Sequence, residues 1–192
     1  MTTIALRAPL SAVGGLTGLA VALALRVGVA GAAGAHSAVA GAVFGCALLA
    51  VAAACGFDRP ALGWRPLCWG VAGAAVLIAP PLLHHLTDPG SGSPSGLLPV
   101  WATVVSLVAV AEEIVLRGTV FEALTEQCGP GVAIAVTAVA FALLHAPLYG
   151  WAVVPLDLAV GVFLGVLRAV AGSVTAPALT HTLADLAGWW LR

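Results

Sequence analysis

The chain has 192 residues, of which 61% are hydrophobic and 8% are charged, and its formal net charge is −1. A soluble domain carries about 25% charged residues, so this composition argues against a water-soluble globular protein. A near-neutral charge argues against a nucleic-acid partner, which would favour a basic stripe. With a mean hydropathy of +1.11, the sequence predicts an all-α, polytopic bundle of transmembrane helices in a lipid bilayer.

Seven apolar segments are candidates for membrane spans, because a spanning helix needs about 20 mostly apolar residues. In chain order they lie near residues 8–25, 37–56, 66–85, 98–124, 130–147, 153–170 and 173–191. The first segment is longer than the core of a signal peptide, so we expect it to be retained. The Gly-, Ser- and Pro-rich stretch 87–95 separates a three-helix part (1–96) from a four-helix part (97–192) of one membrane domain.

Small residues within these segments predict close helix packing. Three glycine pairs have a spacing of four that lets helix backbones approach, and packing within the chain is favoured over a dimer interface. The pairs are Gly14/Gly18, Gly41/Gly45 and Gly161/Gly165. We interpret the four cysteines as small buried apolar residues rather than disulfides or metal ligands. They are Cys46, Cys55, Cys68 and Cys128.

Most charged residues lie near segment ends, where the interface solvates them, and Arg26 and Arg168 are interpreted in this way. The excess of arginine on cytoplasmic loops gives an orientation. If the N-terminus is cytoplasmic, four arginines lie on that side and two lie outside. The cytoplasmic four are Arg7, Arg59, Arg65 and Arg168, and the outer two are Arg26 and Arg192.

The fourth segment is an exception, because Glu112, Glu113 and Arg117 lie in its middle. A charge at this depth costs at least about 2.5–3.5 kcal/mol, which makes such residues functional candidates. Glu113 and Arg117 are four residues apart in the order that favours an ion pair, whereas Glu112 lies about 100° around the helix. We expect Arg117 to orient Glu113 and leave Glu112 free as a general acid or base. Alternatively, all three form an ion-pair network that only holds helices together.

Two further pairs, each with a histidine, lie in the fifth and seventh segments. Phe141 and His145 are four residues apart, and so are His181 and Asp185. The aspartate can accept a ring N–H and fix the tautomer of the histidine. Each pair alone is unspecific, but polar groups on three spans indicate a shared cavity in which they pair or hold a water molecule.

At these residues the chain resembles the CPBP family, also called the ABI family, of type II CAAX prenyl endopeptidases and bacteriocin-processing-type membrane proteases. The family pattern is E-E-x-x-x-R, then F-x-x-x-H, then H-x-x-x-N/D, and the chain has all three in order over roughly residues 98–191. Many members have Asn at the last position, where this chain has Asp185. Asn can donate a hydrogen bond to an oxyanion, whereas an ionised Asp cannot.

The resemblance implies a hydrolase in which Glu112 and His145 position and deprotonate the attacking water. His181, together with Asp185, would stabilise the oxyanion, and the Glu-Arg pair would hold the first motif in shape. The family has also been viewed as metal-dependent, and Glu112, His145 and His181 would then be ligands of Zn²⁺ or another divalent metal. A metal-independent scheme stays open, and the lack of an H-E-x-x-H frame slightly favours it.

These observations predict a membrane-embedded endopeptidase that cleaves a peptide or protein substrate near the bilayer. The alternative is a non-catalytic membrane scaffold or immunity-type protein that keeps the polar constellation. A transporter would be indicated by inverted repeats and broken helices, which the sequence does not contain. The lysine-free composition, rich in Ala, Val, Gly and Arg, is typical of a high-GC bacterium, so we expect the cell (inner or plasma) membrane.

Overall fold

The computed structural model describes residues 2–31, 37–57, 62–88 and 97–191. Within these ranges the regular structure is entirely helical, which confirms the predicted class. The helices are α1 (Thr2–Ala30), α2 (Ala38–Cys55), α3 (Trp64–Thr87), α4 (Leu98–Glu113), α5 (Phe121–Cys128), α6 (Pro130–Tyr149), α7 (Val154–Ala171) and α8 (Thr175–Ala187). A π-helical segment, Ile114–Val120, joins α4 to α5 without a break, and a short 3₁₀ turn, Trp151–Val153, precedes α7.

Six helical stretches of the described residues are long and apolar enough to cross a membrane. They are α1, α2, α3, the continuous stretch from α4 to α5, α6, and α7 with its preceding turn. All seven predicted segments are helical, but the last one, α8, has only 13 residues. A helix of that length measures about 20 Å, whereas the hydrocarbon core of a bilayer is about 30 Å thick.

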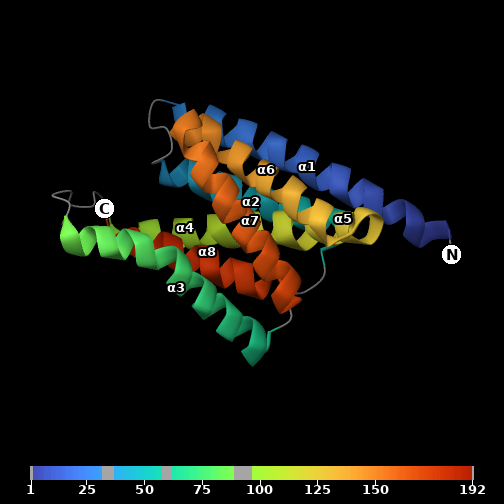
Figure 1. The fold of residues 1–192 in the computed structure, drawn as a ribbon. Coiled ribbons are helices and arrows are strands. Elements are labelled where there is room, and N and C mark those ends of the chain that lie inside the picture. The colour runs from blue at the N-terminus through green and yellow to red at the C-terminus, as the bar shows by residue number, and fades with distance from the viewer. Residues whose placement is uncertain (1, 32–36, 58–61, 89–96, 192) are drawn as a thin grey trace.

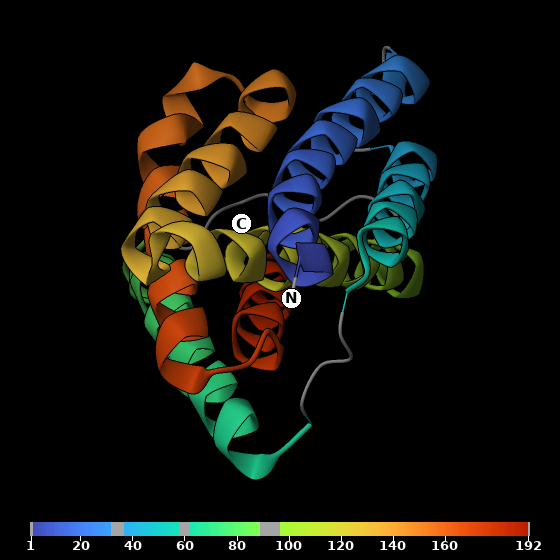
Figure 2. The same cartoon turned by 90° about the vertical axis from the view of Figure 1, so that its right-hand side faces the viewer.

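Figures 1 and 2 show how the helices are arranged around the stretch from α4 to α5. The α1/α2 pair and α6 lie on one side of this stretch, α3 and α8 lie on the other side, and α7 runs from the first side to the second. The closest helix pairs include α6 with α7, α3 with α8, α1 with α2, and α2 with α4. Helices from both predicted parts of the chain therefore pack together, and the polar segment of α4 lies at their centre.

Glycines allow these close approaches, as the sequence predicted. A Cβ atom on Gly18 would lie 2.5 Å from Val51, and one on Gly41 would lie 2.7 Å from Val104. A Cβ atom on Gly161 would lie 2.9 Å from the Cα atom of Ala138 in α6. The predicted glycine pairs thus lie at helix contacts within the chain.

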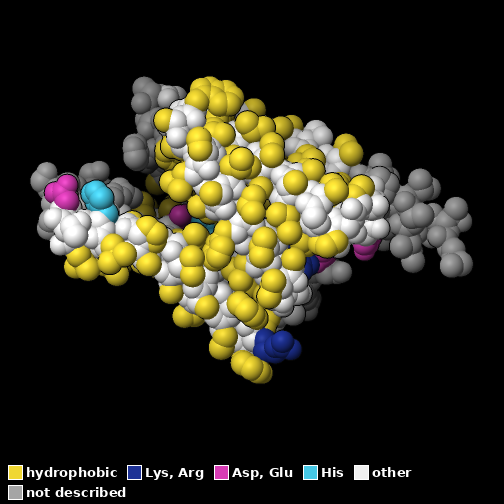
Figure 3. All heavy atoms as spheres, viewed as in Figure 1, with side chains coloured by type: hydrophobic (Ala, Val, Ile, Leu, Met, Phe, Trp, Pro, Cys, Tyr) yellow, Lys and Arg dark blue, Asp and Glu magenta, His cyan; other side chains and the backbone are white. Residues whose placement is uncertain are grey.

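Apolar side chains also cover the outside of the bundle. Figure 3 shows a surface that is mostly hydrophobic, with the charged side chains confined to its ends and to recesses. This is the pattern of a bundle whose solvent is lipid. The prediction of buried cysteines is wrong, because Cys46, Cys68 and Cys128 are exposed and Cys55 is half-buried. A thiol is apolar enough to face lipid, so exposure in a bilayer costs it little.

Candidate active site

One carboxylate oxygen joins two of the predicted motifs. The Oε1 atom of Glu113 accepts a hydrogen bond of 2.8 Å from Nη1 of Arg117 and lies 3.1 Å from Nδ1 of His181. The side chains of Glu113 and Arg117 are fully buried, and that of His181 is 8% exposed. The predicted Glu113–Arg117 pair is present, and it also fixes His181 on α8 against α4.

The arginine of this pair has further partners. Its Nη2 atom donates to the carbonyl oxygen of Gly161 on α7 at 3.0 Å. Its guanidinium carbon lies 4.9 Å from the centre of the Phe141 ring, in a cation–π contact. Arg117 lies within the π-helical segment, where the sequence predicted a regular α-helix. Such segments are rare and frequently occur at functional sites, because the wider turn redirects side chains.

Phe141 is the side chain around which the three motifs meet. Its ring centre lies 4.6 Å from that of His145 and 5.4 Å from that of His181. The phenylalanine is 2% exposed. Both histidines therefore contact one aromatic ring, which also contacts Arg117.

The position of His145 fixes which ring nitrogen is available for chemistry. Its Nδ1 atom lies 2.9 Å from the carbonyl oxygen of Phe141. Because a carbonyl oxygen only accepts, Nδ1 carries the proton in this contact and Nε2 is left as an acceptor. The Oδ2 atom of Asp157 lies 4.0 Å from the same Nδ1 atom, so this carboxylate on α7 is a neighbour of the histidine.

Glu112 differs from its neighbour Glu113 although both are buried. It is 2% exposed, and the charges that act on it include those of His145, His181, Asp185, Arg26 and Arg117. Within the described residues it forms no ion pair. As predicted, Glu113 is paired with Arg117, and Glu112 has no ion-pair partner among the described residues.

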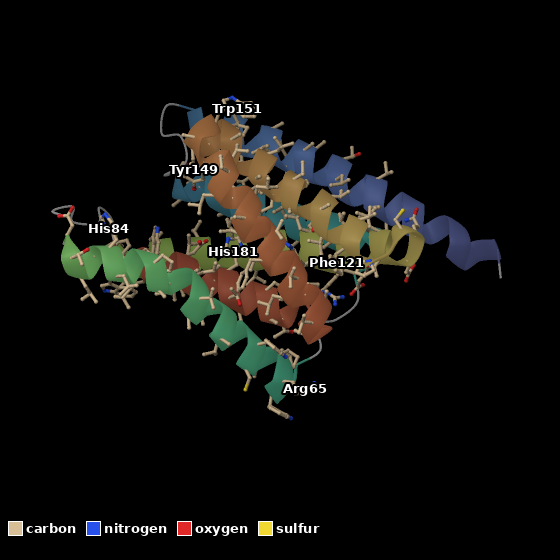
Figure 4. The ribbon with its side chains drawn as sticks, viewed as in Figure 1. Arg65, His84, Phe121, Tyr149, Trp151 and His181 are labelled. Carbon is tan, nitrogen blue, oxygen red and sulfur yellow. The ribbon has the colours of Figure 1, made fainter. Side chains whose placement is uncertain are left out.

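Asp185 lies at the rim of the site. Its Oδ2 atom is 3.5 Å from Nε2 of His181, and its side chain is 38% exposed. Figure 4 labels His181 where α8 passes α7, and Tyr149 close to the end of α6. In Figure 3 an acidic and a histidine side chain are visible within a recess near α4, between α3 and the upper ends of α6 and α7. The site is thus buried at Glu113 and open towards the end where α6 finishes.

Three residues near the site were not assigned to it from the sequence. Arg26 is only 7% exposed, so its interpretation as an interfacial charge is wrong. Tyr149 lies close to Arg26, and its ring stacks on that of His145 with a centroid distance of 5.8 Å. Arg168 donates from Nε to the Arg117 carbonyl at 2.9 Å and pairs with Glu122 at 2.6 Å. Arg168 therefore braces the π-helical segment instead of reaching to the interface.

A catalytic zinc site would need three protein ligands around one open position. Among the described residues, no group of three His, Cys, Asp or Glu side chains is arranged to hold a metal ion. Nδ1 of His145 faces a carbonyl and Nδ1 of His181 faces a carboxylate, which is the usual orientation of a metal-ligating histidine, so Nε2 of each ring is the atom that would be offered to a metal. No step of the chemistry below uses one.

Fold and site together define a multi-pass membrane protein whose ionisable residues from α4, α6 and α8 converge inside its bundle. A family model described as type II CAAX prenyl endopeptidase Rce1-like matches residues 94–187. This region covers just under half of the chain and holds all three motifs, and the match confirms the predicted resemblance and supports a protease-type enzyme in general. No curated protein and no solved structure matches the chain.

Proposed function

We propose that the chain is a membrane-embedded endopeptidase in which Glu112 and His145 activate a water molecule. The observation that carries the proposal is that the two imidazoles that contact Phe141 both act electrostatically on one buried carboxylate, Glu112, which has no ion-pair partner among the described residues. General acid–base catalysis needs such groups within reach of one water molecule. The family match supports the reaction type.

In the proposed reaction, the water oxygen attacks the carbonyl carbon of the scissile peptide bond. Glu112 takes one proton from this water, and the Nε2 atom of His145 accepts a hydrogen bond from the other. The protonated Glu112 then delivers its proton to the leaving nitrogen, and the C–N bond breaks. The products are a carboxylic acid and an amine, and the carboxylate of Glu112 is restored.

His181 is the proposed stabiliser of the oxyanion that forms during this attack. It faces Glu113 through Nδ1 and Asp185 through Nε2. Because ionised carboxylates only accept hydrogen bonds, this position favours an imidazolium with two N–H donors. Asp185 is partly exposed, so a substrate carbonyl can take its place at Nε2, and the loss of the Asn donor is thereby compensated.

The proposed substrate is a peptide or protein segment that reaches the site from the bilayer or its interface. The bundle presents apolar side chains to lipid on its helices, so a membrane-bound segment meets the site without leaving the bilayer. We further propose the cell membrane of a bacterium as its location, on the basis of the lysine-free composition.

Substitution of the water-activating pair tests the function. Purified Glu112→Gln and His145→Ala proteins should lose peptide cleavage by a factor of about 10²–10⁴, the usual contribution of a general acid or base. Their thermal unfolding in detergent should stay close to that of the unsubstituted chain. Arg65→Gln, at an exposed position far from His181 in Figure 4, is the matched control. Cleavage that persists in both variants would exclude this mechanism.

The alternative is a non-catalytic scaffold, and the full burial of the Glu113–Arg117 pair favours it, because such networks also hold helices together. A scaffold predicts that the same two variants lose stability and partner binding together. It also predicts no cleavage by the unsubstituted protein.

Metal analysis of the purified protein, with His145→Ala for comparison, tests whether a divalent metal binds.

A further inference from the structure

A buried cation on α1 lies outside the part of the chain that the family model covers. Arg26 is 7% exposed, whereas its neighbours Leu25 and Val27 are 48% and 44% exposed. Its guanidinium carbon lies 5.0 Å from the centre of the Phe44 ring on α2. The side chain therefore points into the bundle and does not extend to the interface.

The partners of Arg26 within the described residues are neutral. It contacts the Phe44 ring and lies close to the Tyr149 side chain on α6. None of the ion pairs among these residues includes it. Arg117, by comparison, has the carboxylate of Glu113 at 2.8 Å. A buried guanidinium is normally paired, and one without a close anion indicates a site for an anionic group.

The surroundings connect this cation to the candidate active site. Arg26 acts electrostatically on Glu112, and Tyr149, which lies close to Arg26, stacks on His145. Tyr149 is 50% exposed, so a ligand can reach the pair from outside the bundle. A groove of about 180 Å³ between α1 and α6 is lined by apolar side chains that include Leu23 and Leu144. These two residues are three positions before Arg26 and one position before His145.

We propose that Arg26 and Tyr149 bind a carboxylate of the peptide substrate and so set which bond lies over Glu112. The inference rests on the proposed endopeptidase function. A guanidinium and a phenolic hydroxyl can each donate to carboxylate oxygens, and the guanidinium fork can donate to both oxygens at once. The carboxylate comes either from the C-terminus of the peptide or from an acidic side chain, and the two sources are separated by the choice of peptides.

The test measures peptide binding, which needs no hydrolysis. The probes are pools of dansylated octapeptides with mixed apolar residues in three forms: with a free C-terminal carboxylate, with a C-terminal amide, and with a C-terminal amide plus one internal Glu. Anisotropy is measured with the full chain in lipid nanodiscs, in a Glu112→Gln background that prevents turnover. Binding to empty nanodiscs is subtracted.

We expect one acidic pool to bind about 10- to 100-fold more tightly than the neutral pool, as the loss of a charge-assisted hydrogen bond predicts. Tighter binding of the pool with the free C-terminus indicates that the site binds a terminal carboxylate. Tighter binding of the pool with internal Glu indicates that it binds an acidic side chain. Arg26→Gln should remove the preference and Arg26→Lys should keep part of it. Tyr149→Phe, at a half-exposed position, should weaken it a few-fold. Arg65→Gln, which removes one positive charge elsewhere, should keep it.

Equal binding of all three pools, or a preference that survives Arg26→Gln, overturns the inference. Cleavage by the unsubstituted protein without any carboxylate preference also overturns it and leaves the proposed function standing. A carboxylate preference that depends on Arg26, in a protein that cleaves none of the peptides, supports the inference and counts against the endopeptidase. Unfolding temperatures of the variants show which proteins are folded when binding is measured.

Discussion

Two adjacent carboxylates have different surroundings in this chain. Glu113 accepts from Arg117 and contacts His181, and both it and the arginine are fully buried. Glu112 is also buried but forms no ion pair with another described residue. The first carboxylate stabilises the bundle, and the second is available for a reaction.

Substituting each carboxylate by glutamine should therefore give opposite results. Glu113→Gln leaves the Arg117 guanidinium buried without a charge partner, and breaking a buried pair in this way costs about 3–5 kcal/mol. Glu112→Gln removes no pair, so its free energy of unfolding should change by less than about 1 kcal/mol. Thermal or denaturant unfolding in detergent measures both. Equal losses of unfolding free energy would mean that Glu112 contributes as much to stability as Glu113.

The motif residues can be found from the sequence, whereas the position of Arg26 was predicted wrongly. A glutamate pair, an arginine and two histidines stand out in apolar segments, and their spacings of four predict shared helix faces. The first apolar segment was predicted to end at residue 25, so Arg26 was predicted to lie at a segment end. The apolar residues Val27 to Ala30 continue α1 past it, and that continuation was the available signal. Tyr149 carries no such signal, because its role depends on a contact between α1 and α6.

At the scale of the helices, the π-helical segment is the feature that sequence patterns miss. Regular helical spacing predicts one α-helix through residues 98–124, and the register change at Ile114–Val120 follows from tertiary contacts. Arg168 on α7 supplies one of these contacts by donating to the Arg117 carbonyl, and its side chain is 11% exposed. Local propensity contains no information about a partner some fifty positions away.

Removing this brace should loosen the π-helical segment. Arg168→Met loses the donor to the Arg117 carbonyl and the pair with Glu122, and hydrogen bonds to charged groups contribute about 1.5–3 kcal/mol each. Hydrogen exchange should show faster exchange of the amides in residues 114–120. Arg65→Met, at an exposed position, is the control and should leave these rates unchanged. Unchanged exchange in Arg168→Met would show that the segment holds its shape without the arginine.

The contact between α3 and α8 gives a second prediction at this scale. A Cβ atom on Gly73 would lie 2.5 Å from the hydroxyl oxygen of Thr180, whose own bond goes to the Gly70 carbonyl at 2.9 Å. Gly73→Ala should therefore destabilise the protein by about 1–3 kcal/mol through overpacking. Gly28→Ala, where a Cβ would meet nothing within 4 Å, should be neutral or stabilising by up to about 1 kcal/mol. Unfolding in detergent compares the two, and similar values would show that α8 shifts freely away from α3.

For the whole molecule, hydropathy predicted the bundle well because the bilayer requires long apolar helices. It could not predict that α8 is only 13 residues long, since the apolar sequence continues beyond the helix. It also could not predict how the N-terminal helices pack around α4, because small-residue faces fit many partners. Two of the arginines used for orientation, Arg26 and Arg168, are buried in the bundle, and Arg59 and Arg192 lie outside the described residues.

The orientation can be tested with two positions separated by α6. Cys128 precedes this helix and is exposed, and Trp151 follows it and is 74% exposed. If the N-terminus is cytoplasmic, five crossings place residue 151 outside and residue 128 inside. In a chain with its other cysteines changed to serine, an impermeant maleimide should label Trp151→Cys in intact cells and Cys128 only after lysis. Labelling of Cys128 in intact cells would reverse the orientation, and labelling of both would show that α6 does not span.

The single oxygen that joins Arg117 to His181 makes these side chains one unit in evolution as well as in the fold. Once Glu113 is lost, the arginine and the histidine each lack their shared anion, so a second substitution among the three costs less than the first. Such positions show strong epistasis. A lineage that abandons this chemistry is expected to replace all three residues together, with apolar side chains that refill the same volume.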